Sequence, residues 1–283
     1  MTFGDRVAEA VEQTGSTLCV GLDPRIEQLP PELISGLRPG RAGRARAYER
    51  FCAGVIDAVA GEAVAVKPQV AFFEALGGYG ITALERVCEL AREAGLLVIV
   101  DAKRGDIGST SAAYAEAWLH ARDGERPVAD ALTVNAYMGG DALEPFLAAC
   151  SDGAGLFVLA RTSNKEAPEV QAARTDDGVS VTGTILDHLR ALNAGAEPLG
   201  SFGAVVGATI GDTGEDFAFN GPILPPGYGA QGGTAADLPR IFGAALPAVL
   251  PSSSRELLRV GPDPAAMRDA ARRTIDELRA LLG

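Results

Sequence analysis

Histidine and cysteine are scarce in this chain of 283 residues. The two histidines, His120 and His188, fall in helical, polar surroundings, so neither a histidine general base nor a histidine-rich metal site is expected. The four cysteines form no C-x-x-C pair and lie in apolar stretches, which predicts reduced thiols in the core. They are Cys19, Cys52, Cys88 and Cys150. Any chemistry must therefore use aspartate, lysine, serine and arginine.

Long apolar runs and excess positive charge are also missing. No uninterrupted apolar stretch approaches the length of a membrane span, and residues 1–15 have the pattern of a short amphipathic helix, not of a signal peptide. The 37 acidic residues outnumber the 25 basic ones and give a formal net charge of -12, which repels nucleic acid and anionic membranes. We therefore expect a cytoplasmic protein without a nucleic-acid or membrane partner, in which an anionic ligand needs a local basic site.

Eight short, nearly continuous apolar runs recur along the chain. Continuous hydrophobicity is typical of parallel strands that are buried on both faces, whereas half-exposed antiparallel strands alternate. With 47% hydrophobic residues, the chain has enough apolar material for a large core. The predicted strands are 17–23, 63–68, 96–103, 131–137, 155–162, 202–209, 222–227 and 247–252.

Amphipathic helical patterns lie between the runs, with apolar residues at spacings of three and four. Two examples are the faces Phe51, Val55, Val59 and Met267, Ala271, Ile275, Leu278, Leu282. Eight strand-then-helix units predict an α/β fold, a single closed (β/α)8 barrel over residues 1–283. A doubly wound sheet would use fewer strands and a G-x-G-x-x-G turn after the first, where this chain has GLDPR. We expect the longer connections 24–45 and 163–200 to be lid-like or helical insertions.

The polar residues that close the first three runs are all charged. Barrel enzymes place their active sites at this end of the strands. The residues are Asp23, Lys67, Asp101 and Lys103, with Asp106 just beyond. Asp101 and Lys103 could be a structural ion pair, and Asp106 could cap the following helix. Gathering such charges at one barrel mouth costs desolvation, however, and such arrays are commonly functional.

A glycine-rich segment and an arginine follow the last two predicted strands. Residues 225–233 read PPGYGAQGG, and residues 252–256 read SSSRE. Barrels commonly bind phosphate in these two loops, where glycines let backbone N–H groups approach the oxygens. Arg255 can bind two phosphate oxygens at once. The pattern favours a phosphorylated ligand.

The stretch DAKRGDIGST (101–110) resembles the signature of the orotidine 5'-monophosphate decarboxylase family, and PGYGAQGG with Arg255 resembles that family's phosphate-binding segment. The resemblance extends through Asp23, Lys67 and the RTSN stretch (161–164), so it covers nearly the whole chain. The connection around 165–195 is similar to the longer bacterial branch of the family. Lys165 departs from the family pattern, in which a proline commonly follows the Ser-Asn pair.

The resemblance implies a homodimer with shared active sites that converts orotidine 5'-monophosphate (OMP) to UMP in pyrimidine biosynthesis, without a cofactor or a metal. Lys67, Asp101 and Lys103, with Asp106 of the partner subunit, would form an alternating charged array below the pyrimidine. Asp23 and Lys67 would hold the ribose hydroxyls. Thr110 would come from the partner chain, Gln231 would contact both the base and the phosphate, and Ile107 and Pro226 would form walls of the pocket. The implied substrate-binding residues are Asp23, Ile107, Thr110, Ser163, Pro226, Gln231 and Arg255.

Loss of CO2 from C6 leaves an electron pair in an sp2 orbital that the ring cannot delocalise. Electrostatic stabilisation must therefore carry the reaction, and the Lys103 ammonium is expected to stabilise the carbanion and then protonate C6. Binding of the remote phosphate would help to assemble this site.

Three other functions remain as alternatives. A metal-dependent sugar-phosphate decarboxylase or synthase would share the D-x-K-x-x-D pattern but need a carboxylate where Lys67 stands, because an ammonium repels Mg²⁺. A Schiff-base aldolase would use Lys103 as its nucleophile. A catalytically silent nucleotide-binding module is the third, because a fold alone does not guarantee activity.

Overall fold

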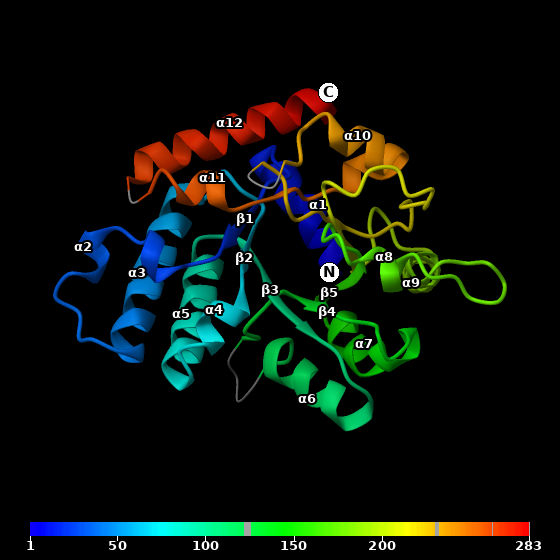
Figure 1. Cartoon of the computed structure of the whole chain (residues 1–283), viewed down its shortest axis with the longest axis horizontal. Coiled ribbons are helices and arrows are strands. Elements are labelled where there is room, and N and C mark those ends of the chain that lie inside the picture. The colour runs from blue at the N-terminus through cyan, green and yellow to red at the C-terminus, as the bar shows by residue number, and fades with distance from the viewer. Residues whose placement is uncertain (122–125, 230–231, 262, 283) are drawn as a thin grey trace.

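A single sheet of eight parallel strands forms the centre of the molecule (Figure 1). The computed structural model describes residues 1–121, 126–229, 232–261 and 263–282. The strands are β1 (Cys19–Leu22), β2 (Ala65–Pro68), β3 (Leu97–Arg104), β4 (Ala131–Val134), β5 (Gly155–Arg161), β6 (Phe202–Val206), β7 (Ile223–Leu224) and β8 (Ser252–Ser253).

The sheet closes on itself. Its order is β7-β6-β5-β4-β3-β2-β1-β8, so each strand pairs with its neighbour in the chain and β1 pairs with β8. Two isolated parallel bridges, Ile223 with Val249 and Pro226 with Ser252, join the two remaining edges. The predicted (β/α)8 barrel is therefore confirmed.

Helices surround the barrel in chain order, with α3 to α5 on the left of Figure 1, α6 and α7 below, α8 and α9 on the right and α12 across the top. The predicted apolar face of α3 is buried, and so is the part of the α12 face from Met267 to Leu278. The α-helices are α1 (Phe3–Thr14), α2 (Pro31–Ile34), α3 (Arg41–Val59), α4 (Val70–Glu74), α5 (Gly78–Glu93), α6 (Gly108–Trp118), α7 (Glu144–Ser151), α8 (Pro168–Gln171), α9 (Val181–Leu192), α10 (Asp237–Phe242), α11 (Arg255–Leu258) and α12 (Pro264–Leu282). Three 3-10 helices join them: η1 (Ile26–Gln28), η2 (Gly140–Leu143) and η3 (Gly243–Ala248). Among the described helices, none is both long and apolar enough to cross a membrane.

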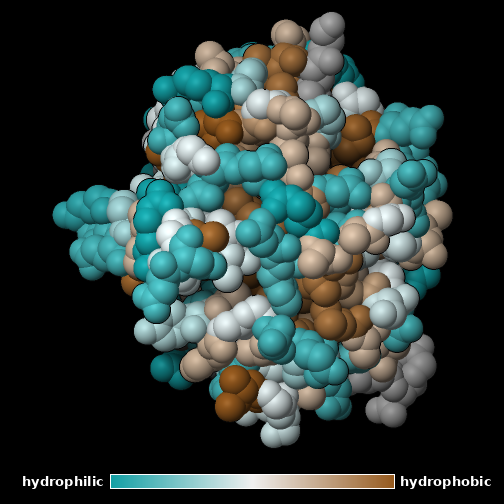
Figure 2. Space-filling model, turned by 90° about the vertical axis from the view of Figure 1, so that its right-hand side faces the viewer, coloured by the Kyte–Doolittle hydropathy of each residue, from teal (hydrophilic) through white to brown (hydrophobic). Residues whose placement is uncertain are grey.

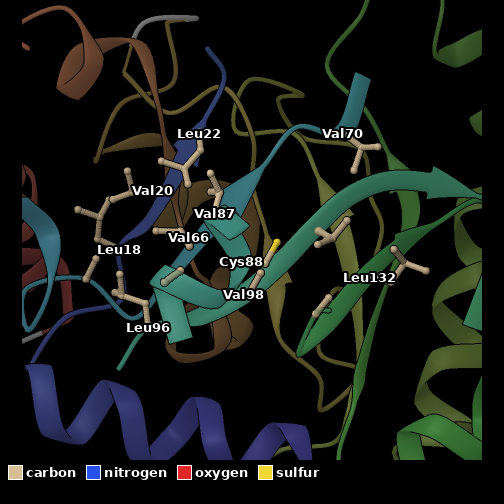
Figure 3. Close-up of a cluster of buried hydrophobic side chains, with 14 of the residues drawn as sticks. Leu18, Val20, Leu22, Val66, Val70, Val87, Cys88, Leu96, Val98 and Leu132 are labelled. Carbon is tan, nitrogen blue, oxygen red and sulfur yellow. The ribbon is translucent and has the colours of Figure 1, made fainter. Parts of the chain in front are cut away.

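The core has two layers, one inside the barrel and one between the sheet and the helices. Alternate strand residues face the two layers, which explains the continuous apolar runs. In the outer layer, Val87 and Cys88 of α5 meet Val66 of β2 and Val98 of β3 (Figure 3). The inner layer contains Cys19, Ala65, Ile99, Ala131, Phe157, Val205 and Leu224.

Helix α1 covers the amino-terminal end of the barrel. The Thr2 hydroxyl accepts a hydrogen bond from the Asp5 N–H, and the Asp5 carboxylate accepts one from the Thr2 N–H, so a capping box fixes the start of the helix. Phe3 is fully buried and packs edge-on against Phe157 inside the barrel, with 5.9 Å between ring centroids. The other end of the barrel is left for a site.

The four cysteines are unpaired and buried, as the sequence predicts. Burial raises the pKa of Cys19, Cys88 and Cys150 to about 12, because an apolar environment disfavours the thiolate. These thiols are core residues and not nucleophiles.

Two details differ from the sequence prediction. The predicted eighth strand, 247–252, begins as the 3-10 helix η3, and only Ser252 and Ser253 form β8; Pro247 suits a helical turn because its φ is fixed. The sixth unit has no helix, because residues 207–222, all of which are described, form a loop.

The two long connections do carry short helices, as expected: η1 and α2 lie within 24–45, and α8 and α9 lie within 163–200. Figure 2 shows the face that carries α8 and α9, which is mainly hydrophilic with scattered apolar areas.

Candidate active site

A cavity of about 820 Å³ opens at the carboxyl ends of the strands. It lies at the end of the barrel opposite α1. Seven of the residues predicted from the sequence line this one cavity: Asp23, Lys67, Asp101, Lys103, Ser163, Pro226 and Arg255. They follow or end six different strands, so the barrel topology brings them together.

The Asp101 carboxylate is the centre of the polar network. Its Oδ2 accepts hydrogen bonds from Lys67 Nζ at 3.0 Å and Gln69 Nε2 at 2.9 Å. Its Oδ1 accepts from Lys103 Nζ at 2.5 Å and from the Thr133 hydroxyl at 2.9 Å. Each oxygen therefore has one cationic and one neutral donor, which holds the carboxylate in one orientation.

Burial differs sharply between the two lysines. The side chains of Lys67 and Asp101 are 8% and 9% exposed, whereas the Lys103 side chain is 43% exposed. All three line the cavity. Burial alone would raise the pKa of Asp101, but Lys67 and Lys103 outweigh it and hold that pKa well below its usual range. Burial likewise would lower the pKa of Lys67, but Asp101 and Asp23 raise it. The pair stays ionised, and Lys103 is the more accessible of the two ammonium groups.

Strand β3 bulges at this point. Val100 pairs with Leu132 and Arg104 pairs with Val134, so three residues of β3 lie opposite the single residue Thr133 of β4. Lys103, within the bulge, has a φ of +50°, which non-glycine residues rarely adopt and which clusters at functional sites.

Asp23 follows β1 and faces the same cavity. Its Oδ2 accepts a hydrogen bond from the Ser254 hydroxyl at 2.7 Å. Its Oδ1 is buried and accepts no hydrogen bond from the described residues. A buried carboxylate oxygen without a partner costs free energy, so it is suited to receive a ligand hydroxyl.

The other side of the cavity contains the loops after β5, β7 and β8. Ser163 lies between Thr162 and Asn164, and Pro226 precedes Gly227, all of them lining the cavity. Arg255 is the first residue of α11 and is exposed to the cavity. Gln231 lies outside the described residues.

Three predicted residues are not at the cavity of their own chain. Among the described lining residues there is no Asp106, Ile107 or Thr110. Ile107 is 61% exposed, so a single chain does not use it as the pocket wall that was expected. Asp106 does not cap α6 either, because the cap position is Ile107, whose N–H donates to Asp106 Oδ1 at 2.8 Å.

Sequence reasoning missed several residues of the cavity. Gln69 and Thr133 each lie two residues beyond an inward-facing residue, Lys67 and Ala131, so strand alternation was a signal that could have found them. Arg25, whose guanidinium lies 5.0 Å from the centre of the Phe72 ring, also lines the cavity and had no such signal.

No group of three or more histidine, cysteine, aspartate or glutamate residues within the described ranges is placed to hold a metal ion. Asp101, the central acid of the cavity, has the ammonium groups of Lys67 and Lys103 as neighbours instead.

Residues 16–270 match the family described as "Orotidine 5'-phosphate decarboxylase / HUMPS family". The chain belongs to this family. It is similar to the orotidine 5'-phosphate decarboxylases of Nocardioides sp., with 56% identity over 98% of this chain and 99% of the relative, and of Streptomyces coelicolor, with 53% identity over 98% and 97%.

Solved structures agree with this membership. The Streptomyces avermitilis protein assigned as orotidine 5'-phosphate decarboxylase has a TM-score of 0.90 and 50% identity, and the match covers 99% of this chain and 96% of that one. The Leishmania donovani OMP decarboxylase has a TM-score of 0.73 and 31% identity over 99% and 98%. The orotidine 5'-phosphate decarboxylase fold therefore extends over the whole chain, insertions included.

Proposed function

We propose that this chain is an orotidine 5'-phosphate decarboxylase, a carboxy-lyase that converts OMP to UMP and CO2 in pyrimidine biosynthesis. The observation that carries the proposal is the buried Asp101 carboxylate held between Lys67 and Lys103 in the wall of the cavity, with Lys103 the more exposed of the two lysines. The enzyme acts in the cytoplasm as one barrel domain over residues 1–283, and the reaction needs no cofactor and no metal.

The substrate binds across the cavity from the phosphate loops to the charged array. Arg255, with Gln231, binds the phosphate, and Ser163 contacts the edge of the pyrimidine beside Pro226. Asp23 and Lys67 hold the ribose hydroxyls, and the unpartnered Oδ1 of Asp23 supports this role. Binding of the phosphate, remote from C6, supplies free energy for assembling the charged site.

The bond between C6 and the carboxylate breaks, and its electron pair stays on C6 as CO2 leaves. The Lys103 ammonium stabilises this charge and then donates a proton to C6, which gives UMP and a neutral amine that regains its proton from water. Asp101, fixed by four donors, holds the ammonium in place and lies where it repels the substrate carboxylate but not CO2.

A second subunit completes the site. Asp106, Ile107 and Thr110 stand together at the start of α6, outside their own cavity, and Ile107 is exposed. Tyr137 and Met138, in the loop after β4, are 77% and 58% exposed, which favours a covering partner. In the proposed homodimer Asp106, Ile107 and Thr110 reach the neighbour's cavity, with Asp106 beside Lys103 and Thr110 near the ribose.

The test is the loss of ultraviolet absorbance of OMP, with and without exhaustive chelation by EDTA. We expect equal rates in both samples, because an ammonium at Lys67 repels a divalent cation. Strict dependence on Mg²⁺ would instead identify a metal-dependent relative. Trapping by borohydride in the presence of substrate would identify a Schiff-base aldolase, and tight UMP binding without turnover would identify a silent binding module.

A further inference from the structure

Thr133, in the middle of β4, joins the two residues on which the proposed reaction depends. Its side chain is fully buried. Its hydroxyl oxygen accepts a hydrogen bond from the Lys103 N–H at 2.9 Å, and its hydroxyl proton is donated to Asp101 Oδ1, also at 2.9 Å. Because a hydroxyl has one proton and the N–H is already a donor, these two contacts fix its orientation.

The bulge in β3 explains why a side chain is needed here. Regular pairing with β4 stops after Val100 and resumes at Arg104, whose carbonyl accepts a hydrogen bond from the Asn135 N–H. Between these points, the Lys103 N–H donates to a side chain instead of to a backbone carbonyl. Without that contact, the left-handed conformation of Lys103 would lose a hydrogen bond that holds it.

The same Asp101 oxygen that accepts from Thr133 also accepts from Lys103 Nζ. The threonine hydroxyl therefore holds both the backbone that carries the ammonium and the carboxylate that aims it. From this geometry we infer that Thr133 is a positioning residue, which places the Lys103 ammonium for proton transfer to C6. This inference rests on the proposed decarboxylase function.

The hydroxyl can be removed at nearly constant shape by Thr133→Val and retained in Thr133→Ser. We expect Thr133→Val to lower kcat by about tenfold or more, with the KM for OMP and the Kd for UMP changed by less than about threefold. Thr133→Ser should keep kcat within about threefold of the wild type. Thr274→Val, which removes another buried hydroxyl, one bonded to the Ala270 carbonyl within α12, is the matched control and should leave kcat unchanged.

A second measurement isolates the proton transfer. By microscopic reversibility, an enzyme that protonates C6 must also exchange the C6 hydrogen of UMP with solvent, which NMR detects in D2O. This exchange should fall in Thr133→Val in parallel with kcat, whereas a merely structural loss of stability would leave it unchanged in the folded protein.

Each outcome decides the inference. A folded Thr133→Val with wild-type kcat and wild-type exchange would overturn it, as would a loss confined to UMP affinity. If Thr133→Val does not fold, Thr133→Ser and Thr133→Ala give the same comparison, because they differ only in the hydroxyl; equal kcat values would then overturn it. Absence of OMP turnover in the wild type would instead disprove the proposed function.

Discussion

Lysine is a rare residue in this chain, which contains only three, at positions 67, 103 and 165. Two of the three contact Asp101, while arginine supplies nearly all of the remaining positive charge. Arginine does not lose its proton in proteins, whereas an ammonium can give one up, so of these two cationic residues only lysine can transfer a proton. The distribution of lysine supports the proposed role of Lys103.

Lys103→Ala should therefore abolish most of the turnover. We expect kcat to fall by at least about 10^3-fold, on the scale of losing a central electrostatic catalyst, while the Kd for UMP stays close to that of the wild type. Lys165→Ala is the matched control, because the Lys165 side chain is 92% exposed and does not line the cavity. Near-normal turnover of Lys103→Ala would mean that Lys103 is only structural.

Arg255 allows a prediction about the phosphate. Arg255→Ala should weaken nucleotide binding on the order of 3 kcal/mol, as expected for a charge-assisted bidentate contact, and should hardly affect substrates without phosphate. Steady-state kinetics with OMP and with orotidine measure the two effects. Arg86→Ala, which removes a mostly exposed arginine from α5, provides the control. Equal losses with both substrates would place Arg255 outside the phosphate site.

At the scale of elements, the end of β3 has little room beside β4. A Cβ atom on Gly105 would lie only 2.4 Å from the Asn135 carbonyl oxygen, so this position accepts glycine alone. Gly105 follows Arg104, where pairing with β4 resumes after the bulge, and precedes Asp106. The close approach of the two strands therefore fixes the direction in which the chain leaves the barrel.

Gly105→Ala should destabilise the protein by about 1–3 kcal/mol, because backbone must shift to make room. It should also lower kcat by moving Lys103. Urea unfolding measures the first effect, and OMP turnover the second. Gly54→Ala is the control: no atom lies within 4 Å of its added Cβ, and within α3 the change should be neutral or stabilising by about 0.5–1 kcal/mol. Equal stabilities of the two variants would contradict the strand contact.

The elements also show what could be predicted from the sequence. Continuous apolar runs locate the strands because every strand is covered on both faces. Asp23, Lys67 and Asp101 could then be predicted as site residues, because the carboxyl ends of barrel strands meet at one mouth. The β3 bulge could not be predicted, because it depends on the register between two strands. Strand alternation places Thr133 on the inward face, but threonine is an ordinary strand residue, and its hydrogen-bond partners are needed to show what its hydroxyl does.

At the scale of the whole molecule, the charge of the cavity opposes that of the chain. The net charge is -12, yet the cavity is lined by five cationic side chains, Arg25, Lys67, Lys103, Arg255 and Arg259. Two acids of the same lining, Asp23 and Asp101, leave an excess of positive charge there. An anionic nucleotide is thus attracted to this cavity, while the net negative charge of the molecule repels polyanions.

The proposed dimer is the remaining feature at this scale, and mixing of inactive variants tests it. Lys103→Ala and Asp106→Ala homodimers should each be nearly inactive. After dissociation and equal mixing, random pairing makes about half of the dimers mixed, and twofold symmetry gives each mixed dimer one site with both changes and one with neither. Activity should therefore return to about a quarter of the wild-type value.

The positions of Asp106, Ile107 and Thr110, outside their own cavity, motivate this expectation. Native mass spectrometry must verify that heterodimers are present. If verified heterodimers stay inactive, Asp106 acts within its own chain and the sites are not shared.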